Sequence, residues 1–452
     1  MQWLLILSGI TMLVACLAMV IVPYLRGRAD LLTTWSLFLL GLANFVGISA
    51  IQSGTAENHA YGIFGTPEYW RFAAGSLVFL AAVSITYYKF QWPRRLAHRR
   101  LQKTPPVAVT PMIFAMCVCA VLTIAGIKAP NVQFIGQILI FIGLSAANYA
   151  GAFAFYIWDE RRFNPAALAL LAGGVGLGVI SSLGQGSGRI YVLTTLMTVP
   201  FCWYWKTLRH KPVRNTLIPL GVGLLLTFFV LQGYSAIRHL RRDPDASAAQ
   251  LAISRLKAIP EAFGRGGTSL FGGDTTDASL LAIQRYTTVA EPHPFFTVIY
   301  VLSNPIPRAW WPEKIGSLGE TLPKDIGIWS RFGYVSLGPG IVGHGYHEGG
   351  LHMLVFYGFL IGSALRFIDE LLATRSDNAF LVGMIASIGG FFFALPRGEL
   401  GLYIVHIISG FLTGFLLNII CRVFFGTVDH RNVMPQHVDV HQGDEYAAWE
   451  YH

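Results

Sequence analysis

Long apolar runs recur along the chain and constrain its fold more than any other feature of the sequence. Eleven runs of roughly 17–26 residues alternate with polar segments, and about 20 apolar residues suffice for a helix to cross a membrane. The chain is 54% hydrophobic and 13% charged, against about 25% charged residues in soluble domains. We therefore expect an all-α polytopic membrane protein with about 11 transmembrane helices. The runs lie at 2–22, 31–51, 72–91, 107–128, 132–157, 166–184, 190–205, 216–234, 351–368, 379–395 and 401–421.

Lysine and arginine gather in alternate connecting segments, which predicts the orientation of the chain. Residues 89–103 hold six of them and residues 206–215 hold four, whereas 53–70 and 128–131 are poor in basic residues. By the positive-inside rule, the N-terminus lies outside and the C-terminus lies in the cytoplasm. Because topology accounts for the formal charge of +9, we expect no nucleic-acid partner.

One connecting segment, residues 235–350, is much longer than the others and falls on the external side. Its tryptophans, including Trp310, Trp311 and Trp329, argue against disorder. We expect short helices in it, including an amphipathic helix at 246–264. The predicted organisation is an N-terminal bundle of about eight spans (1–234), a large external loop (235–350), about three C-terminal spans (351–425) and a cytoplasmic tail (426–452).

Three arginines stand at the predicted external ends of the runs. Arg189 ends "SSLGQGSGR", Arg397 lies in "ALPRGEL", and Arg308 lies in "NPIPRAWW". The planar guanidinium group suits phosphate and pyrophosphate, and glycines beside Arg189 leave backbone N–H groups free to face an anion. The alternative is that each arginine anchors the chain at the lipid headgroups.

Histidines mark two further stretches of the external loop. "VAEPHPFF" holds Glu291 and His293 between prolines, and "GPGIVGHGYHEGG" (338–350) holds His344, His347 and Glu348. The helical zinc motif sets its histidines four residues apart, and the glycines here make a helix across the pair unfavourable, so we expect no metal. A neutral histidine can instead act as a general base. The alternative is a glycine hinge with polar residues at headgroup depth.

Together these segments resemble the Wzy-type O-antigen and exopolysaccharide repeat-unit polymerases. The resemblance rests on "AEPHPFF", on "NPIPRAWWPEK", and on "GPGIVGHGYHEGG" leading into an apolar run. It covers the topology of nearly the whole chain and, at the level of residues, about 181–192, 289–350 and 395–400. It implies a GT-C-like integral membrane glycosyltransferase of the bacterial inner membrane, with its active site facing the periplasm.

The resemblance also implies substrates, partners and residue roles. Donor and acceptor would be undecaprenyl-pyrophosphate-linked oligosaccharides held in the lipid bilayer, and a chain-length co-polymerase and a flippase would be partner proteins. No metal or cofactor is implied. Arg189 and Arg397 would hold the pyrophosphate with support from Arg308, and His344 or His347 would be the base beside Glu348. The remaining residues of the pyrophosphate and glycan site would be Glu291, His293 and Trp311.

Two other functions remain open. An O-antigen ligase shares the architecture, but its pattern of a histidine followed seven residues later by Glu-Leu is absent around His344 and His347. A lipid-linked oligosaccharide flippase or another transporter usually has ionisable residues or broken helices near the middle of the membrane. Asn44 and Asn148 are the main polar candidates of that kind in this sequence.

Overall fold

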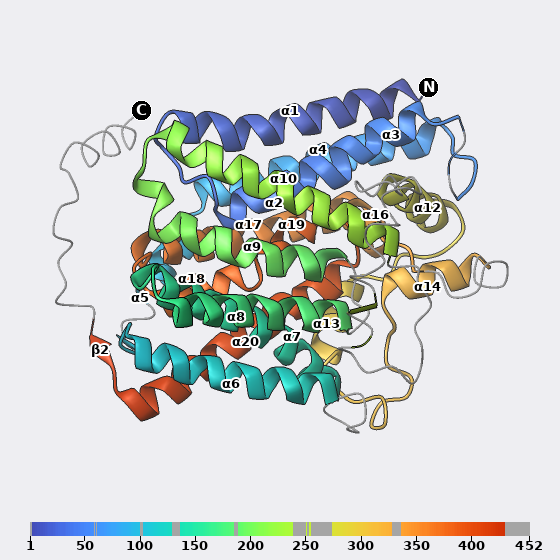
Figure 1. Cartoon of the computed structure of the whole chain (residues 1–452). Coiled ribbons are helices and arrows are strands. Elements are labelled where there is room, and N and C mark those ends of the chain that lie inside the picture. The colour runs from blue at the N-terminus through green and yellow to red at the C-terminus, as the bar shows by residue number, and fades with distance from the viewer. Residues whose placement is uncertain are drawn as a thin grey trace.

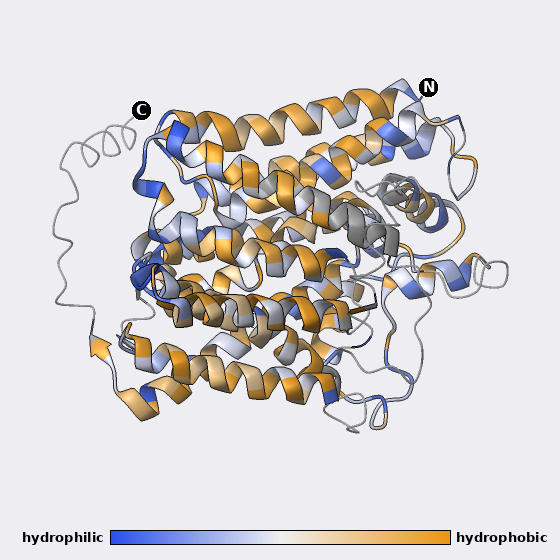
Figure 2. Cartoon of the chain, viewed as in Figure 1, coloured by the Kyte–Doolittle hydropathy of each residue, from blue (hydrophilic) through white to orange (hydrophobic). Residues whose placement is uncertain are grey.

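A computed structural model describes residues 2–57, 59, 61–99, 103–128, 136–184, 189–237, 250, 253–254, 274–327 and 336–429. Long helices lie side by side in one bundle (Figure 1), mainly hydrophobic along their length, with hydrophilic residues toward the two ends (Figure 2). The predicted amphipathic helix at 246–264 lies almost entirely outside the described residues. So do Trp329 and residues 430–452 of the predicted tail.

Eight helices in the described part of the chain are long and apolar enough to cross a membrane. The chain is therefore an all-α polytopic membrane protein, while eleven spans and the orientation stay predictions. The eight are α1 (Trp3–Leu25), the continuous helix of α2 (Thr34–Leu42), η1 (Ala43–Ile48) and α3 (Ser49–Thr55), α4 (Thr66–Lys89), α6 (Val109–Lys128), α7 (Gly136–Glu160), α8 (Pro165–Gly184), α17 (Leu351–Thr374) and α20 (Leu400–Phe425).

The other three predicted runs coincide with helices that are shorter, less apolar or broken. They are α9 (Arg189–Lys206), α10 (Val213–Ile237) and the pair α18 (Ala379–Ala386) and α19 (Gly389–Ala394). At the break, the side chain of Asn148 donates to the carbonyl oxygen of Ser387 (3.2 Å), and Thr195 donates to Asn148 (2.8 Å). A side chain thus satisfies a backbone group that the broken helix leaves free.

Short elements gather at the two ends of the bundle (Figure 1). At the end that we call the short-helix end lie α12 (Asp274–Thr288), α13 (Phe296–Ser303), α14 (Leu318–Asp325) and α16 (Gly340–Glu348). At the opposite end lie α5 (Trp92–Arg99), η3 (Leu208–His210) and the antiparallel pair of β1 (Lys103–Thr104) and β2 (Val428–Asp429). Because the predicted cytoplasmic segments 89–103 and 206–215 fall there, we call it the basic end.

Glycines allow some of these helices to approach very closely. A Cβ atom on Gly41 of α2 would lie 1.9 Å from the carbonyl oxygen of Phe393 in α19, so no other residue fits there without movement. This contact holds the second half of the broken pair against the first part of the chain.

The glycine-rich stretch 338–350 is a helix over most of its length, so the prediction that its glycines disfavour a helix was wrong. Every residue of α16 is buried. A Cβ atom on Gly345 would lie 2.4 Å from the side chain of Leu354, and one on Gly343 would lie 3.3 Å from Cα of Ser279 in α12. Close packing against α12 and α17 outweighs the low helix propensity of glycine, because tertiary contacts provide most helix stability.

Candidate functional site

His344 and Glu348 stand one turn apart on the same face of α16 and share a hydrogen-bond network. Nδ1 of His344 lies 3.0 Å from the hydroxyl of Thr297, which donates to Oε1 of Glu348 at 2.5 Å. The hydroxyl of Tyr357 donates to Oε2 of Glu348, and the backbone N–H of Leu400 donates to Nε2 of His344 at 3.3 Å. Because Nε2 accepts, the network assigns the proton to Nδ1 and leaves the imidazole neutral.

Glu399 joins this network from the other side of His344. Its Oε1 lies 3.7 Å from Nε2 of His344, and its carboxylate accepts the backbone N–H groups of Leu318 (3.0 Å) and Gly319. These N–H groups belong to the first two residues of α14 and have no partner within that helix, so a carboxylate there is favourable. Burial raises the pKa of Glu399 despite the opposing effect of His344 and both N–H groups. Glu399 therefore ties α14, α16 and the start of α20 together.

His347 points to a different side of α16 and packs among aromatic rings. Its ring centre lies 4.4 Å from that of Tyr286, 4.6 Å from that of Phe296 and 5.2 Å from that of His293. Burial, together with His344 and His293, lowers the pKa of His347 to about 3, so this imidazole is neutral at physiological pH. Its buried Nδ1 has no hydrogen-bond partner among the described residues.

His293 is the one exposed member of this histidine group. Its backbone N–H donates to the carbonyl oxygen of His347 at 2.9 Å, so the segment before α13 is attached directly to α16. Its side chain is exposed, as is that of Glu291, whereas His344 and His347 are buried. The structure thus brings four predicted site residues together (His293, His344, His347 and Glu348), with only His293 at the surface.

The predicted arginines fall into two groups at the short-helix end. Arg397 precedes α20 and lies over the ring of Phe45 in η1 at 5.5 Å, and Arg189 is the buried first residue of α9. Arg189 begins the helix whose Tyr191 hydroxyl lies 2.6 Å from Nε2 of His406 in α20. Arg308 lies instead in the turning segment after α13, where it donates to the carbonyl oxygen of Lys314 at 3.1 Å.

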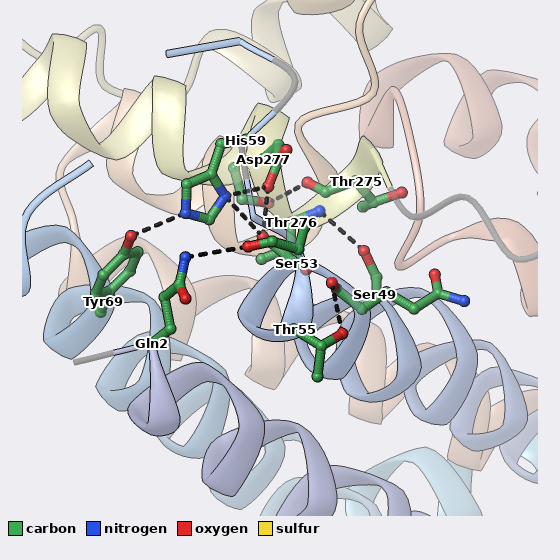
Figure 3. Close-up of polar contacts among 12 residues, drawn as sticks. Gln2, Ser49, Ser53, Thr55, His59, Tyr69, Thr275, Thr276 and Asp277 are labelled. Atoms are coloured by element: carbon green, nitrogen blue, oxygen red, sulfur yellow. Dashed lines mark hydrogen bonds and ion pairs between the residues drawn. The ribbon is translucent and has the colours of Figure 1, made fainter. Parts of the chain in front are cut away.

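A second buried polar cluster joins α3, α4 and α12 (Figure 3). Nδ1 of His59 lies 3.0 Å from the carboxylate of Asp277, and Nε2 lies 2.8 Å from the hydroxyl of Tyr69. Ser53 also donates its hydroxyl to Asp277. Because Asp277 accepts at Nδ1, His59 carries its proton there and Nε2 accepts from Tyr69. The hydroxyl of Ser53 lies 3.2 Å from Nδ1 of His59. In a Ser–His–Asp triad the serine faces Nε2, so this cluster does not have the geometry of an activated serine nucleophile.

Sequence reasoning missed Thr297, Tyr357, Glu399 and the whole His59–Asp277 cluster. Glu399 had one usable signal, because it follows the predicted Arg397 by two positions in "PRGEL". His59 and Asp277 are 218 positions apart and lie in no common motif. Within the described part of the chain, no three His, Cys, Asp or Glu side chains gather as metal ligands.

The fold and the site thus define an all-helical polytopic membrane protein with a buried His–Glu network beside arginines at one end of its bundle. Comparison with known proteins found no matching family model, no matching curated protein and no matching solved structure. Its function is therefore inferred from the site and from the sequence motifs.

Proposed function

We propose that this protein is a GT-C-like membrane glycosyltransferase that polymerises undecaprenyl-pyrophosphate-linked oligosaccharide repeat units. One observation supports this proposal above the others. Arg397 stands two positions before Glu399, whose carboxylate lies 3.7 Å from Nε2 of His344. Arg189 begins α9, and the hydroxyl of Tyr191 in that helix lies 2.6 Å from Nε2 of His406 in α20. A cation suited to a pyrophosphate therefore lies close in sequence to the His344–Glu399 network, and His293 is attached to the same helix as that network through the carbonyl oxygen of His347.

The proposed reaction transfers the glycan from its pyrophosphate to a sugar hydroxyl. The hydroxyl oxygen attacks the anomeric carbon, the bond from that carbon to the pyrophosphate oxygen breaks, and the configuration inverts. Arg189 and Arg397 neutralise the charge that develops on the leaving pyrophosphate. A base accepts the proton of the attacking hydroxyl. No nucleotide is consumed, because the donor is already activated.

Because His344 and His347 are buried and His293 is exposed, His293 is the best candidate for this base. His347 is a weak proton acceptor, because its pKa lies at about 3. His344 already accepts a hydrogen bond at Nε2 and is completely buried. His293 is exposed and bound through its backbone to α16. We therefore assign the proton transfer to His293, while His344, His347 and Glu348 position the segment that carries it.

The cellular context of the proposal follows the resemblance stated above. The protein would act in the bacterial inner membrane with its short-helix end in the periplasm, where a flippase would deliver its substrates. A co-polymerase would set the chain length of the product. An O-antigen ligase would use the same donor and the same arginines, but a different acceptor.

One structural observation favours transport as a second candidate. The break between α18 and α19 is lined by Asn148, Thr195 and Ser387, and broken helices with polar partners are typical of transporters. In this protein these polar groups hydrogen-bond to one another. They therefore also stabilise the broken helix pair itself.

Incubation of the purified protein, in liposomes, with lipid-linked repeat units separates these functions. A ladder of products indicates a polymerase, and transfer to lipid A core indicates a ligase. Movement of intact substrate across the liposome without a new glycosidic bond indicates a transporter and would overturn the proposal. In the polymerase case, Arg189→Ala and Arg397→Ala should each reduce the ladder by about 100-fold or more. Arg214→Ala, an exposed arginine of α10, should leave the ladder unchanged.

A further inference from the structure

A small polar recess lies between the end of α13 and the start of α14. Its volume is about 120 Å³, and it is lined by Tyr300, Asn304, Arg308, Lys314, Ser317 and Glu320, among others. The ring of Tyr300 lies against Gly401 in the first turn of α20. Tyr300 therefore lines the recess and also packs against the start of α20.

Two cations line this recess, and neither forms an ion pair within the described part of the chain. Lys314 is only 6% exposed, and its Nζ donates to the carbonyl oxygens of Asn304 (2.7 Å) and Ile306 (2.9 Å). An ammonium group has three donors, so one remains for a ligand. In the described part of the chain, neither Lys314 nor Arg308 has a carboxylate within the 4.0 Å of an ion pair. Arg308 is exposed, whereas Lys314 is buried. A buried, unpaired charge is costly, and an anion bound to Lys314 would offset that cost.

The charges around the recess favour a ligand with a single negative charge. Arg308 and Lys314 supply two positive charges and Glu320 supplies one negative charge, which leaves one in excess. Burial and the neighbouring Arg308 lower the pKa of Lys314, as expected for a cation that lacks a counter-ion. Burial and Glu399 raise the pKa of Tyr300 to about 12, so its hydroxyl stays protonated and can donate to an anion. A pyrophosphate would bring more negative charge than the recess can neutralise.

Two exposed tryptophans lie on the turn between Arg308 and Lys314, two residues that line the recess. Their backbone N–H groups donate to the carbonyl oxygen of Pro307, at 3.0 Å for Trp310 and 3.1 Å for Trp311. The hydrogen bond from Arg308 to Lys314 holds the two ends of the same turn together. The exposed fractions are 72% for Trp310 and 38% for Trp311. The backbone N–H of Lys314 donates to the carbonyl oxygen of Trp311 at 3.1 Å, so Trp311 is three positions from a residue of the recess, and a planar ring can offer an apolar surface to one face of a sugar ring.

We propose that this recess binds the carboxylate of an acidic sugar, with the sugar ring against Trp311. Arg308 and the third Nζ donor of Lys314 hold the carboxylate, and Glu320 excludes ligands of higher charge. Combined with the proposed polymerase function, on which this extension rests, the site implies that the polymerised repeat unit contains a uronic acid. The binding site itself requires no catalytic step.

Isothermal titration of the full-length protein in nanodiscs tests this proposal with three probes: cellobiouronic acid, neutral cellobiose and inorganic phosphate. We expect cellobiouronic acid to bind measurably tighter than cellobiose. Arg308→Gln should weaken its binding by roughly tenfold, because a hydrogen bond to a charged group is lost. Trp311→Ala should weaken both disaccharides. Arg308→Lys, which keeps the charge, should restore part of the affinity.

Glu320→Gln is the sharpest variant, because it should improve binding. Removing the one carboxylate of the recess should raise the affinity for cellobiouronic acid roughly threefold to tenfold, with little effect on cellobiose. A purely structural role of Arg308 and Lys314 in closing the turn would produce no such gain, and that result would overturn the proposal. Phosphate binding tighter than the uronate would also overturn it. This binding experiment uses no lipid-linked substrate, so its result does not depend on the polymerase activity. The recess can bind the uronate even if the protein is not a polymerase, and the protein can be a polymerase even if the recess does not bind the uronate.

Discussion

The backbone N–H of Leu400 donates a hydrogen bond of 3.3 Å to Nε2 of His344, although 56 positions separate them in the sequence. This bond uses the first N–H of α20, a group that has no partner within its own helix. It also determines which nitrogen of His344 carries the proton. One contact thus joins the start of a long helix to the centre of the buried network.

The network predicts that His344 is important for stability. His344→Ala removes the partner of Leu400 and one partner of Thr297 in a fully buried place. We expect a loss of about 2–4 kcal/mol, seen as a lower thermal unfolding temperature in detergent. His352→Ala is the matched control, because His352 is exposed at the start of α17. Equal unfolding temperatures for both variants would contradict the structural role.

A second prediction concerns the proposed base. His293→Gln should reduce polymer formation by about 100-fold or more without lowering the unfolding temperature, because its side chain is exposed. His352→Gln, a change at an exposed histidine of α17, serves as the control. Full activity of His293→Gln would remove the assignment and return the role to His344 or His347.

The low pKa of His347 predicts a pH-dependent stability. The folded protein protonates this imidazole only near pH 3, whereas the unfolded chain protonates it below its ordinary value of 6.5. The unfolded state therefore binds more protons in this window. The contribution of His347 is present above pH 6.5 and is lost as the pH falls toward 3, by up to about 1.4 kcal/mol per pH unit.

Unfolding temperatures of the wild type and of His347→Phe measure this effect. The substitution should reduce the loss of stability between pH 7 and pH 5 by about 1–2 kcal/mol, because phenylalanine binds no proton. Its ring can also pack against Tyr286 and Phe296, as the imidazole does. Parallel curves for the two proteins over this range would show that His347 does not titrate as described.

The His59–Asp277 contact predicts energetic coupling between distant parts of the chain. His59→Ala and Asp277→Ala should each destabilise the protein, and the double variant should lose less than the sum. The difference should be about 1–3 kcal/mol, because each single change leaves a buried polar group without its partner. Ser53→Ala offers a milder comparison in the same cluster. Strictly additive losses would mean that the two side chains act independently.

Local patterns were sufficient to predict the helical scaffold. Each apolar run is a property of one continuous segment, and a membrane forces such a segment to satisfy its own backbone hydrogen bonds. The runs therefore coincide with helices, from α1 to α20. The proline-rich segment 304–314 turns as its prolines require. The break between α18 and α19 was not predicted, because residues 379–395 carry no charge and no proline up to the last residue of the run.

The arrangement of the site depended on contacts that no local pattern contains. Glycine propensity argued against a helix at 340–348, and packing against α12 and α17 reversed that outcome. That helix places His344 beside Thr297 and Glu399 and buries His347 away from the surface. The sequence by itself determined where the helices run, since membrane insertion depends on the composition of each segment. Only the tertiary structure decided which polar side chains meet, because those meetings depend on how distant helices pack.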